Sequence, residues 1–290
     1  MEFTGERFMP GMEGQIELEH KHRYFLAREY ARGKVVLDIA SGEGYGTALI
    51  SEVSEFVYGV DVSSEAINYS KIKYAGVKNI EFLEGSCAAI PLPDSSVDFV
   101  CSFETIEHHD QHHQMMAEIV RVLKPEGIFI ISSPDKFVYS DSVKYENPFH
   151  VKELYKHEFE ALISHYFENV VFHSQKVFYG SIVTGAEHDQ FVYYKTGHDE
   201  CDRTELDSAP YLIALASNGK LPVPYSGMLD NSSEYAESVE QLEGEVQRLM
   251  QIESELRLKL LENLPANLNK RRGLIRRFLR SLRKRCKKIW

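Results

Sequence analysis

The sequence contains few cysteines and no long apolar run. Its four cysteines lie far apart without a C-x-x-C pair, which argues against a disulfide framework or a zinc knuckle and fits a reducing compartment. No 18-residue apolar stretch occurs, so we expect no membrane-spanning helix. The first ten residues, MEFTGERFMP, lack the apolar core of a signal peptide. We therefore expect a cytoplasmic protein.

Acidic residues are missing from one end of the chain. Residues 265–290 hold eleven Lys and Arg and no Asp or Glu, whereas residues 1–264 carry a net charge of −22. A helix that is apolar on one side and strongly basic on the other is typical of binding to an anionic membrane surface, and a nucleic acid, a protein partner or plain solvation are the alternatives. Apolar residues recur in this tail at steps of three and four: Ile275, Phe278, Leu282, Cys286 and Ile289.

The composition of the whole chain, 43% hydrophobic with 16 Tyr and 16 Phe, is sufficient for a sizeable core. Short apolar strands alternate with helix-like segments, which predicts an α/β fold with a mainly parallel sheet covered on both faces. In such sheets, cofactors bind at the carboxyl ends of the strands. The expected strands are 35–39, 56–60, 80–83, 99–102, 128–132, 170–172 and 211–216, and the expected helices are 45–53, 64–75, 111–123 and 151–165.

We divide the chain into a domain over 1–216, a linker over 217–233, a coiled coil over 234–264 and the basic tail over 265–290. The linker segment contains Pro222 and Pro224 and shows no periodicity. Heptad spacing predicts a short coiled coil and hence a homodimer or homotrimer, with a single surface helix as the alternative. The heptad residues are Tyr235, Leu242, Leu249 and Leu256 at one position and Val239, Val246 and Leu260 at the other.

The most informative segment is residues 35–46, VVLDIASGEGYG, in which a strand containing Asp38 runs through closely spaced glycines into a helix. Glycine lets the backbone approach a ligand closely. A dinucleotide loop requires G-x-G-x-x-G, but Thr47 stands at the last position, and that motif does not explain Asp38. Asp61 ends the next strand, where it could accept hydrogen bonds from both ribose hydroxyls. The pattern favours a cofactor with a cationic end.

Four ordered motifs between residues 35 and 134 resemble those of the class I S-adenosylmethionine-dependent methyltransferases. They are VLDIASGEGYG, GVDVS, FLEGSCAAIPLPDSSVDFVCSFETIEH and EIVRVLKPEGIFIISSP. The resemblance implies a Rossmann-like seven-stranded sheet with one antiparallel strand, and S-adenosylmethionine as cofactor. It also implies the following contacts: Asp38, Ala40, Gly42 and Gly44 with the methionine part, Asp61 with its neighbour Val62 at the ribose, Ser86 and Cys87 at the adenine, and Phe103 and Glu104 beside the sulfonium.

Two positions depart from the family pattern. Ala40 replaces the usual first glycine, a small-for-small change that we expect to be harmless. Ser86 stands where an Asp often binds the adenine amino group, which puts that contact in doubt.

Histidines supply candidates for a general base, which a sugar hydroxyl needs because it must lose its proton as it attacks. His150, at the end of the NPFH segment, is the first candidate and His108 the second, with Glu104 as a further catalytic residue. Each histidine could instead be a surface or helix-capping residue. Arg23, in the segment EHKHRYF, could pair with the cofactor carboxylate or with an acidic acceptor.

The cluster EHHDQHH at 107–113 also raises the question of a metal, because His108 and His112, and His109 and His113, are four residues apart. The helical phase is uncertain at the mouth of a strand, so we predict no metal site. We expect His109, His112 and His113 to be solvated.

The segments TGERFMPG, EHKHRYFLARE and NPFHVKEL resemble methyltransferases associated with bacterial surface-polysaccharide (O-antigen type) biosynthesis. This implies O-methylation of a sugar hydroxyl on a lipid-linked glycan, capping the chain, at the inner face of the membrane and beside glycosyltransferases. The alternatives are a small-molecule or quinone methyltransferase, a nonenzymatic membrane-peripheral scaffold, and a nucleotide-dependent dehydrogenase, which Thr47 disfavours. A nucleic-acid substrate is not expected, because the acidic body repels phosphates.

Overall fold

A computed structural model describes residues 15–178, 193–196, 201–204, 208–229, 244–246 and 248–253. The chain forms two compact units, Met1–Leu229 and Asp230–Trp290. In the second unit, residues 244–246 and 248–253 are helical. Most of the segment predicted as a coiled coil, and the whole basic tail, lie outside the described residues. No described helix has the length and apolar character needed to cross a bilayer.

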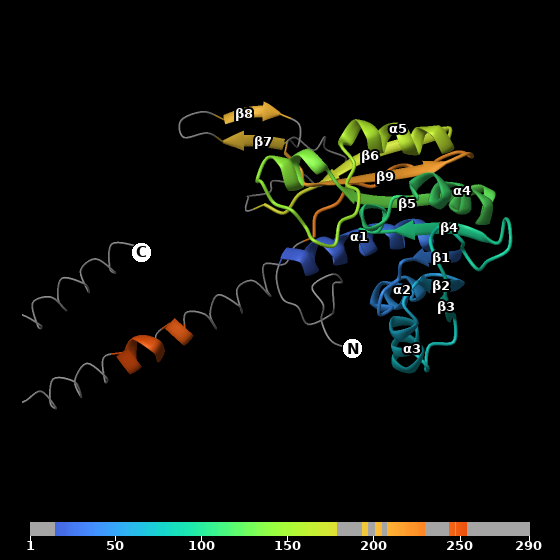
Figure 1. The fold of residues 1–290 in the computed structure, drawn as a ribbon, viewed down its shortest axis with the longest axis horizontal. Coiled ribbons are helices and arrows are strands. Elements are labelled where there is room, and N and C mark those ends of the chain that lie inside the picture. Colours follow the sequence, from blue (N-terminus) through green and yellow to red (C-terminus); the bar gives the residue numbers. More distant parts are fainter. Residues whose placement is uncertain are drawn as a thin grey trace, which may run out of the picture. The chain divides into compact units, whose positions relative to one another are not determined.

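The first unit is built on a seven-stranded sheet with strand order β3-β2-β1-β4-β5-β9-β6 (Figure 1). Strand β9 is antiparallel to both of its neighbours, whereas β1–β5 pair in parallel, so the predicted Rossmann-like α/β sheet is confirmed. A separate hairpin of β7 (Tyr193–Thr196) and β8 (Cys201–Thr204) was not predicted. The strands of the main sheet are β1 (Val35–Ile39), β2 (Phe56–Asp61), β3 (Ile80–Glu84), β4 (Val97–Ser102), β5 (Leu123–Pro134), β6 (Asn169–Gln175) and β9 (Tyr211–Ser217).

Helices cover both faces of the sheet, which is why its strands are apolar almost throughout. Val36 and Phe99 point into a core shared with α1 and α2, whereas their neighbours Leu37 and Val100 point into a core shared with α4 and α5. Each such fully buried side chain contributes about 1.5–3 kcal/mol. The sheet is therefore a rigid base for the loops at its carboxyl ends. The helices are α1 (Gln15–Ala31), α2 (Tyr45–Ser51), α3 (Ser64–Lys73), α4 (His112–Val122) and α5 (Lys156–Tyr166).

Helix α5 begins five residues later than the sequence predicts, at Lys156 rather than at 151. The preceding residues are held by contacts with another loop, because the N–H groups of Val151 and Lys152 both donate to the carbonyl oxygen of Glu107, at 2.8 and 3.0 Å. A helix would use these donors internally. The interaction docks the NPFH segment against the loop that follows β4.

Residues 218–229 contain no helix or strand and lie against the first unit. The N–H of Tyr225 donates to the hydroxyl of Tyr30 at 2.9 Å, and the two rings meet edge to face at 5.4 Å. Leu221 packs on the core beside α1. The boundary between the two compact units therefore falls after Leu229, inside the segment that we predicted as the linker.

Candidate cofactor site

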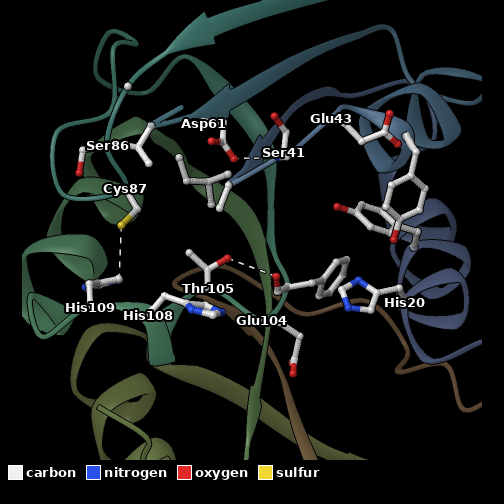
Figure 2. Close-up of a pocket in the computed structure, with 18 residues that line it drawn as sticks. His20, Ser41, Glu43, Asp61, Ser86, Cys87, Glu104, Thr105, His108 and His109 are labelled. Carbon is white, nitrogen blue, oxygen red and sulfur yellow. Dashed lines mark hydrogen bonds between the residues drawn. The ribbon is translucent and has the colours of Figure 1, made fainter. Parts of the chain in front are cut away.

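A cavity of about 340 Å³ opens at the carboxyl ends of β1, β2 and β4. The strand order reverses between β1 and β4, and ligands of open α/β sheets bind at such a switch point. Figure 2 shows Asp61 and Ser86 on one side of the cavity and Glu104, His108 and His20 on the other. Nine of the thirteen predicted site residues line it: Ala40, Gly42, Asp61, Val62, Ser86, Cys87, Phe103, Glu104 and His108.

The glycines after β1 serve different purposes. Gly42 lines the cavity with a φ of +55°, and a Cβ added to it would meet no protein atom within 4 Å. Gly42 therefore leaves open space on the cavity side. Gly44, which we expected at the methionine part, does not line the cavity, because a Cβ there would lie 2.6 Å from the ring of Phe82. A Cβ on Gly46 would overlap the ring of Tyr24.

Asp61 joins the glycine loop to the end of β2. Its Oδ2 accepts the N–H of Gly42 at 2.9 Å, and its Oδ1 accepts the N–H of Ser63 at 2.8 Å. An ionised carboxylate has about four acceptor positions, so Asp61 can hold the loop and still accept hydrogen bonds from a vicinal diol. The adjacent Val62 is 70% exposed and adds an apolar contact to the same wall.

Asp38 does not line the cavity, contrary to the expected contact with the methionine part. It faces the α1 and α2 side of the sheet, is 1% exposed, and accepts hydrogen bonds from Thr47 Oγ1 at 2.6 Å, Tyr24 Oη at 3.2 Å and Cys101 Sγ at 3.4 Å. Burial raises the pKa of its carboxyl to about 6, although these hydrogen bonds partly oppose the increase. Asp38 therefore positions Tyr24, which does line the cavity.

Ala40 lines the cavity but has a φ of +61°, in the left-handed region. A Cβ in this region costs about 1–2 kcal/mol. The replacement of glycine by alanine, which we expected to be harmless, is therefore compatible with the packing but strains the backbone.

Glu104 is also held in a left-handed conformation, with a φ of +50°. Ser132 stabilises it, because Ser132 Oγ donates to Glu104 Oε1 at 2.6 Å and accepts the N–H of Glu104 at 3.1 Å. Arg23 Nη1 lies 3.5 Å from the same carboxylate oxygen. Strained residues persist only where their surroundings fix them, so these contacts hold the carboxylate of Glu104 in the cavity wall.

Arg23 lies behind the cavity rather than in its wall, and its expected pairing with the cofactor carboxylate stays a prediction. It is 1% exposed, its Nε donates to Gln175 Oε1 at 2.7 Å, and its guanidinium lies 4.4 Å from the ring centroid of Tyr211. Gln175 Nε2 in turn donates to the carbonyl of Glu19 at 3.0 Å. Arg23 and Gln175 therefore fasten α1 to β6 and β9.

Of the two base candidates, His108 lines the cavity and His150 does not. His108 Nδ1 lies 3.0 Å from the carbonyl oxygen of Phe149, a contact that places its proton on Nδ1 and its lone pair on Nε2. His150 Nδ1 lies 2.5 Å from Glu153 Oε1, and its Nε2 lies 3.0 Å from Asn147 Nδ2. Of these two histidines, His108 is therefore the one in the cavity wall, and its accepting nitrogen is Nε2.

The remaining cavity residues were not assigned from the sequence. His20 and Tyr24 both line the cavity from α1, and their spacing of four residues places them on one face of that helix, a signal that could have identified them. Burial lowers the pKa of His20 to about 3 and also lowers the pKa of His109. The others are Ile39, Ser41, Glu43, Tyr45, Gly85, Thr105 and His109.

The other histidines of the EHHDQHH cluster are not all solvated. His109 lines the cavity, with its Nε2 3.4 Å from Cys87 Sγ. His112 is 4% exposed and contacts the carbonyl of His109 through Nε2 at 2.8 Å, so its expected exposure is wrong. His113 is exposed, as expected.

Comparison with known proteins agrees with this geometry. Residues 37–131 match a family model described as a methyltransferase domain. This part of the chain is therefore similar to methyltransferase domains. This match supports the interpretation of the glycine loop as that of a methyltransferase rather than of a dehydrogenase.

Two mycobacterial relatives described as probable S-adenosylmethionine-dependent methyltransferases are similar over 163 residues. The one from Mycolicibacterium smegmatis is 35% identical over 55% of this chain and 62% of its own, and the one from Mycobacterium tuberculosis is 32% identical over 55% and 58%. The chain thus spans about three fifths of these relatives. A solved structure of a Pyrococcus horikoshii protein shares the fold, with a TM-score of 0.51 and 20% identity over 74% of this chain and 95% of that one.

The two mycobacterial relatives are described as S-adenosylmethionine-dependent, and the residues present in this cavity fit that cofactor. Gly42 leaves space for a ligand, Asp61 can accept hydrogen bonds from a diol, and Glu104 adds a second carboxylate to the cavity wall. No Lys or Arg occurs among the described residues that line the cavity. An acidic wall favours a cationic ligand.

Proposed function

We propose that the protein transfers the methyl group of S-adenosylmethionine to a hydroxyl oxygen of its acceptor, with His108 as the general base. The observation that carries this proposal is the position of His108 in the cavity wall, two strand ends away from Asp61 and beside Glu104 and Thr105. The contact of Nδ1 with the Phe149 carbonyl orients the ring and directs proton acceptance to Nε2.

The cofactor supplies an electrophilic methyl group on a cationic sulfur. The acceptor oxygen forms its bond to the methyl carbon while the carbon–sulfur bond breaks and the sulfur leaves as a neutral thioether. His108 Nε2 takes the hydroxyl proton during this step. Glu104, fixed by Ser132 and Arg23, supplies negative charge beside the cation and aligns the cofactor for in-line attack.

We propose a sugar hydroxyl on a lipid-linked surface glycan as the acceptor. The cavity wall supports an uncharged polyhydroxylated acceptor, because its described residues combine carboxylates, histidines and the rings of Tyr24, Tyr45 and Phe103 without any Lys or Arg to neutralise an acidic acceptor. The eleven basic residues of the tail support recruitment to an anionic membrane, where such a lipid-linked acceptor lies. The heptads of 234–264 support a homo-oligomer.

The test of the base uses the full chain, radiolabelled S-adenosylmethionine and a panel of glycan, small-molecule and quinol acceptors. The His108→Ala variant is expected to lose at least about 100-fold in turnover. It should bind S-adenosylhomocysteine as the wild type does. His113→Ala, which removes an exposed histidine of the same cluster, is the matched control. A loss of less than tenfold in His108→Ala removes it as the base.

Two further outcomes separate the alternatives. Absence of S-adenosylhomocysteine binding by the full chain contradicts the enzyme proposal as a whole. Cofactor binding without turnover on any glycan, together with retained recruitment of glycosyltransferases, favours the scaffold.

The proposal for the tail is tested separately with a variant that lacks residues 265–290. Its binding to vesicles that contain anionic lipid is expected to be lost, since each Lys or Arg near such a surface contributes about 1 kcal/mol. Unchanged vesicle binding contradicts membrane recruitment by the tail.

A further inference from the structure

Glu107, His108 and His150 come together from two loops that are distant in the sequence. One ligand atom from each of the three side chains lies within 4.8 Å of the other two. Neither His112 nor His113, which the sequence pairs with His108 and His109, belongs to this group. We propose that Glu107, His108 and His150 bind a divalent transition-metal ion at the end of the cofactor cavity that His108 lines.

The carboxylate of Glu107 is the main support for this site. Glu107 is 1% exposed, and neither of its carboxylate oxygens receives a hydrogen bond from another described residue. Buried polar groups almost always have a partner, and a buried carboxylate without one is costly. An ion held between Glu107 and the two imidazoles would provide the missing partner.

The surroundings orient the two histidines as ligating histidines are oriented in known metal sites. In such sites the second ring nitrogen of a ligating histidine donates to a carbonyl or a carboxylate. His108 Nδ1 lies 3.0 Å from the carbonyl of Phe149, and His150 Nδ1 lies 2.5 Å from Glu153 Oε1. Both imidazoles therefore carry their lone pairs on Nε2, and the ring planes are nearly perpendicular with centroids 5.1 Å apart.

The backbone also holds the two loops together. The carbonyl of Glu107 accepts the N–H groups of both Val151 and Lys152, so the two loops that carry the proposed site are hydrogen-bonded to each other. Asn147 competes with an ion for His150, because its Nδ2 lies 3.0 Å from His150 Nε2. Binding an ion at His150 requires this amide to move aside.

The donor set indicates the kind of ion. Two imidazoles and one carboxylate are the ligands of many catalytic zinc sites, which keep a fourth position for water or substrate. Mg²⁺ and Ca²⁺ prefer oxygen ligands throughout, which this group does not offer. We therefore assign Zn²⁺ as the ion to test first, with Mn²⁺ as the second because the carboxylate of Glu107 also suits it.

The role of the ion rests on the proposed hydroxyl methylation. With the ion bound, His108 Nε2 is a ligand and no longer takes the proton. The ion instead polarises the acceptor hydroxyl and lowers its pKa. The proton leaves to water, the resulting alkoxide forms the bond to the methyl carbon, and the carbon–sulfur bond breaks as before. Metal-free and metal-loaded protein thus activate the same hydroxyl in different ways.

The test treats the full chain with chelator, dialyses it against buffered Zn²⁺ or Mn²⁺, and measures the bound ion by mass spectrometry. One ion per chain is expected. The affinity should fall at least about tenfold in Glu107→Gln and in His150→Ala and stay unchanged in His113→Ala. Asn147→Ala, which removes the competing amide, should bind the ion at least as tightly as the wild type.

Binding of S-adenosylhomocysteine and circular dichroism are recorded for every variant, so that loss of the ion is distinguished from loss of the fold or of the cofactor site. Absence of a stoichiometric ion in the wild type overturns the site, as does equal affinity in Glu107→Gln and His150→Ala. Equal turnover of the chelated and the metal-loaded enzyme overturns the catalytic role of the ion. Failure of cofactor binding would instead overturn the proposed function.

Discussion

The substitution Asp38→Asn tests how the structure uses the acid in the glycine loop. Asp38 is 1% exposed and surrounded by the hydroxyls of Tyr24 and Thr47 and the thiol of Cys101, and burial raises its pKa from an ordinary 3.8 to about 6. The folded protein holds the proton of Asp38 more tightly than the unfolded chain does. Protonated Asp38 therefore makes its full contribution to the free energy of unfolding below about pH 4, and this contribution is lost as the pH rises through 6.

The size of the effect follows from the two pKa values. A difference between 3.8 and about 6 corresponds to a loss of about 3 kcal/mol in the free energy of unfolding across this window. Asparagine has the same shape but does not titrate. The difference in free energy of unfolding between wild type and Asp38→Asn should therefore change by about 3 kcal/mol between pH 4 and pH 7.5, in favour of the variant at the higher pH.

The assay is urea denaturation of the cofactor-free protein at a series of pH values, followed by circular dichroism. The substitution Asp110→Asn is the matched control, because that side chain is exposed and solvated in both states. If the difference in free energy of unfolding between the wild type and Asp38→Asn stays constant from pH 4 to pH 7.5, the reasoning is refuted, since Asp38 would then not be a buried, titrating group.

Three other substitutions have expected outcomes that follow from the backbone and packing of the site. Ala40→Gly should increase the free energy of unfolding by up to about 1 kcal/mol in urea denaturation, because it relieves a φ of +61°, and a decrease would contradict the strain. Gly42→Ala should weaken S-adenosylhomocysteine binding in calorimetry and lower the free energy of unfolding by about 1 kcal/mol. Gly46→Ala should lower the free energy of unfolding by up to about 3 kcal/mol, because its Cβ overlaps Tyr24. Equal effects of the two substitutions on cofactor binding and on stability would contradict the roles assigned to the two glycines. Arg23→Met should cost about 3 kcal/mol or more by removing the partner of the Glu104 carboxylate, and a cost under 1 kcal/mol would show that the pair does not stabilise the fold.

The sheet and the position of its cavity could be predicted because they depend on local pattern. Apolar strands, the glycine loop and the acid at the end of β2 are each contained within a few residues of sequence. The face of the sheet on which Asp38 lies could also have been predicted, since side chains alternate along a strand and Asp38 shares its face with Val36 rather than with Leu37. A contact with α1 and α2 could therefore have been predicted.

The roles of His108 and His150 could not be predicted in the same way. Which histidine faces the cavity depends on how the 147–154 loop docks, and that is set by two N–H groups donating to the carbonyl of Glu107, across more than forty residues of sequence. The same docking creates the group of Glu107, His108 and His150. Spacing within the EHHDQHH cluster carries no information about it.

The attachment of α1 to the last strands has a consequence for the order in which the site is completed during synthesis. Helix α1 supplies His20 and Tyr24 to the cavity, but Arg23 and the Glu19 carbonyl hold it through Gln175, at the end of β6. Strand β6 in turn pairs with β9, which ends at Ser217. A ribosome that has translated the whole of 37–131 has therefore produced every glycine and acid of the cofactor loop before the strands that fasten α1 through Gln175. The nascent chain should acquire its full cofactor affinity only after residue 217 has left the exit tunnel.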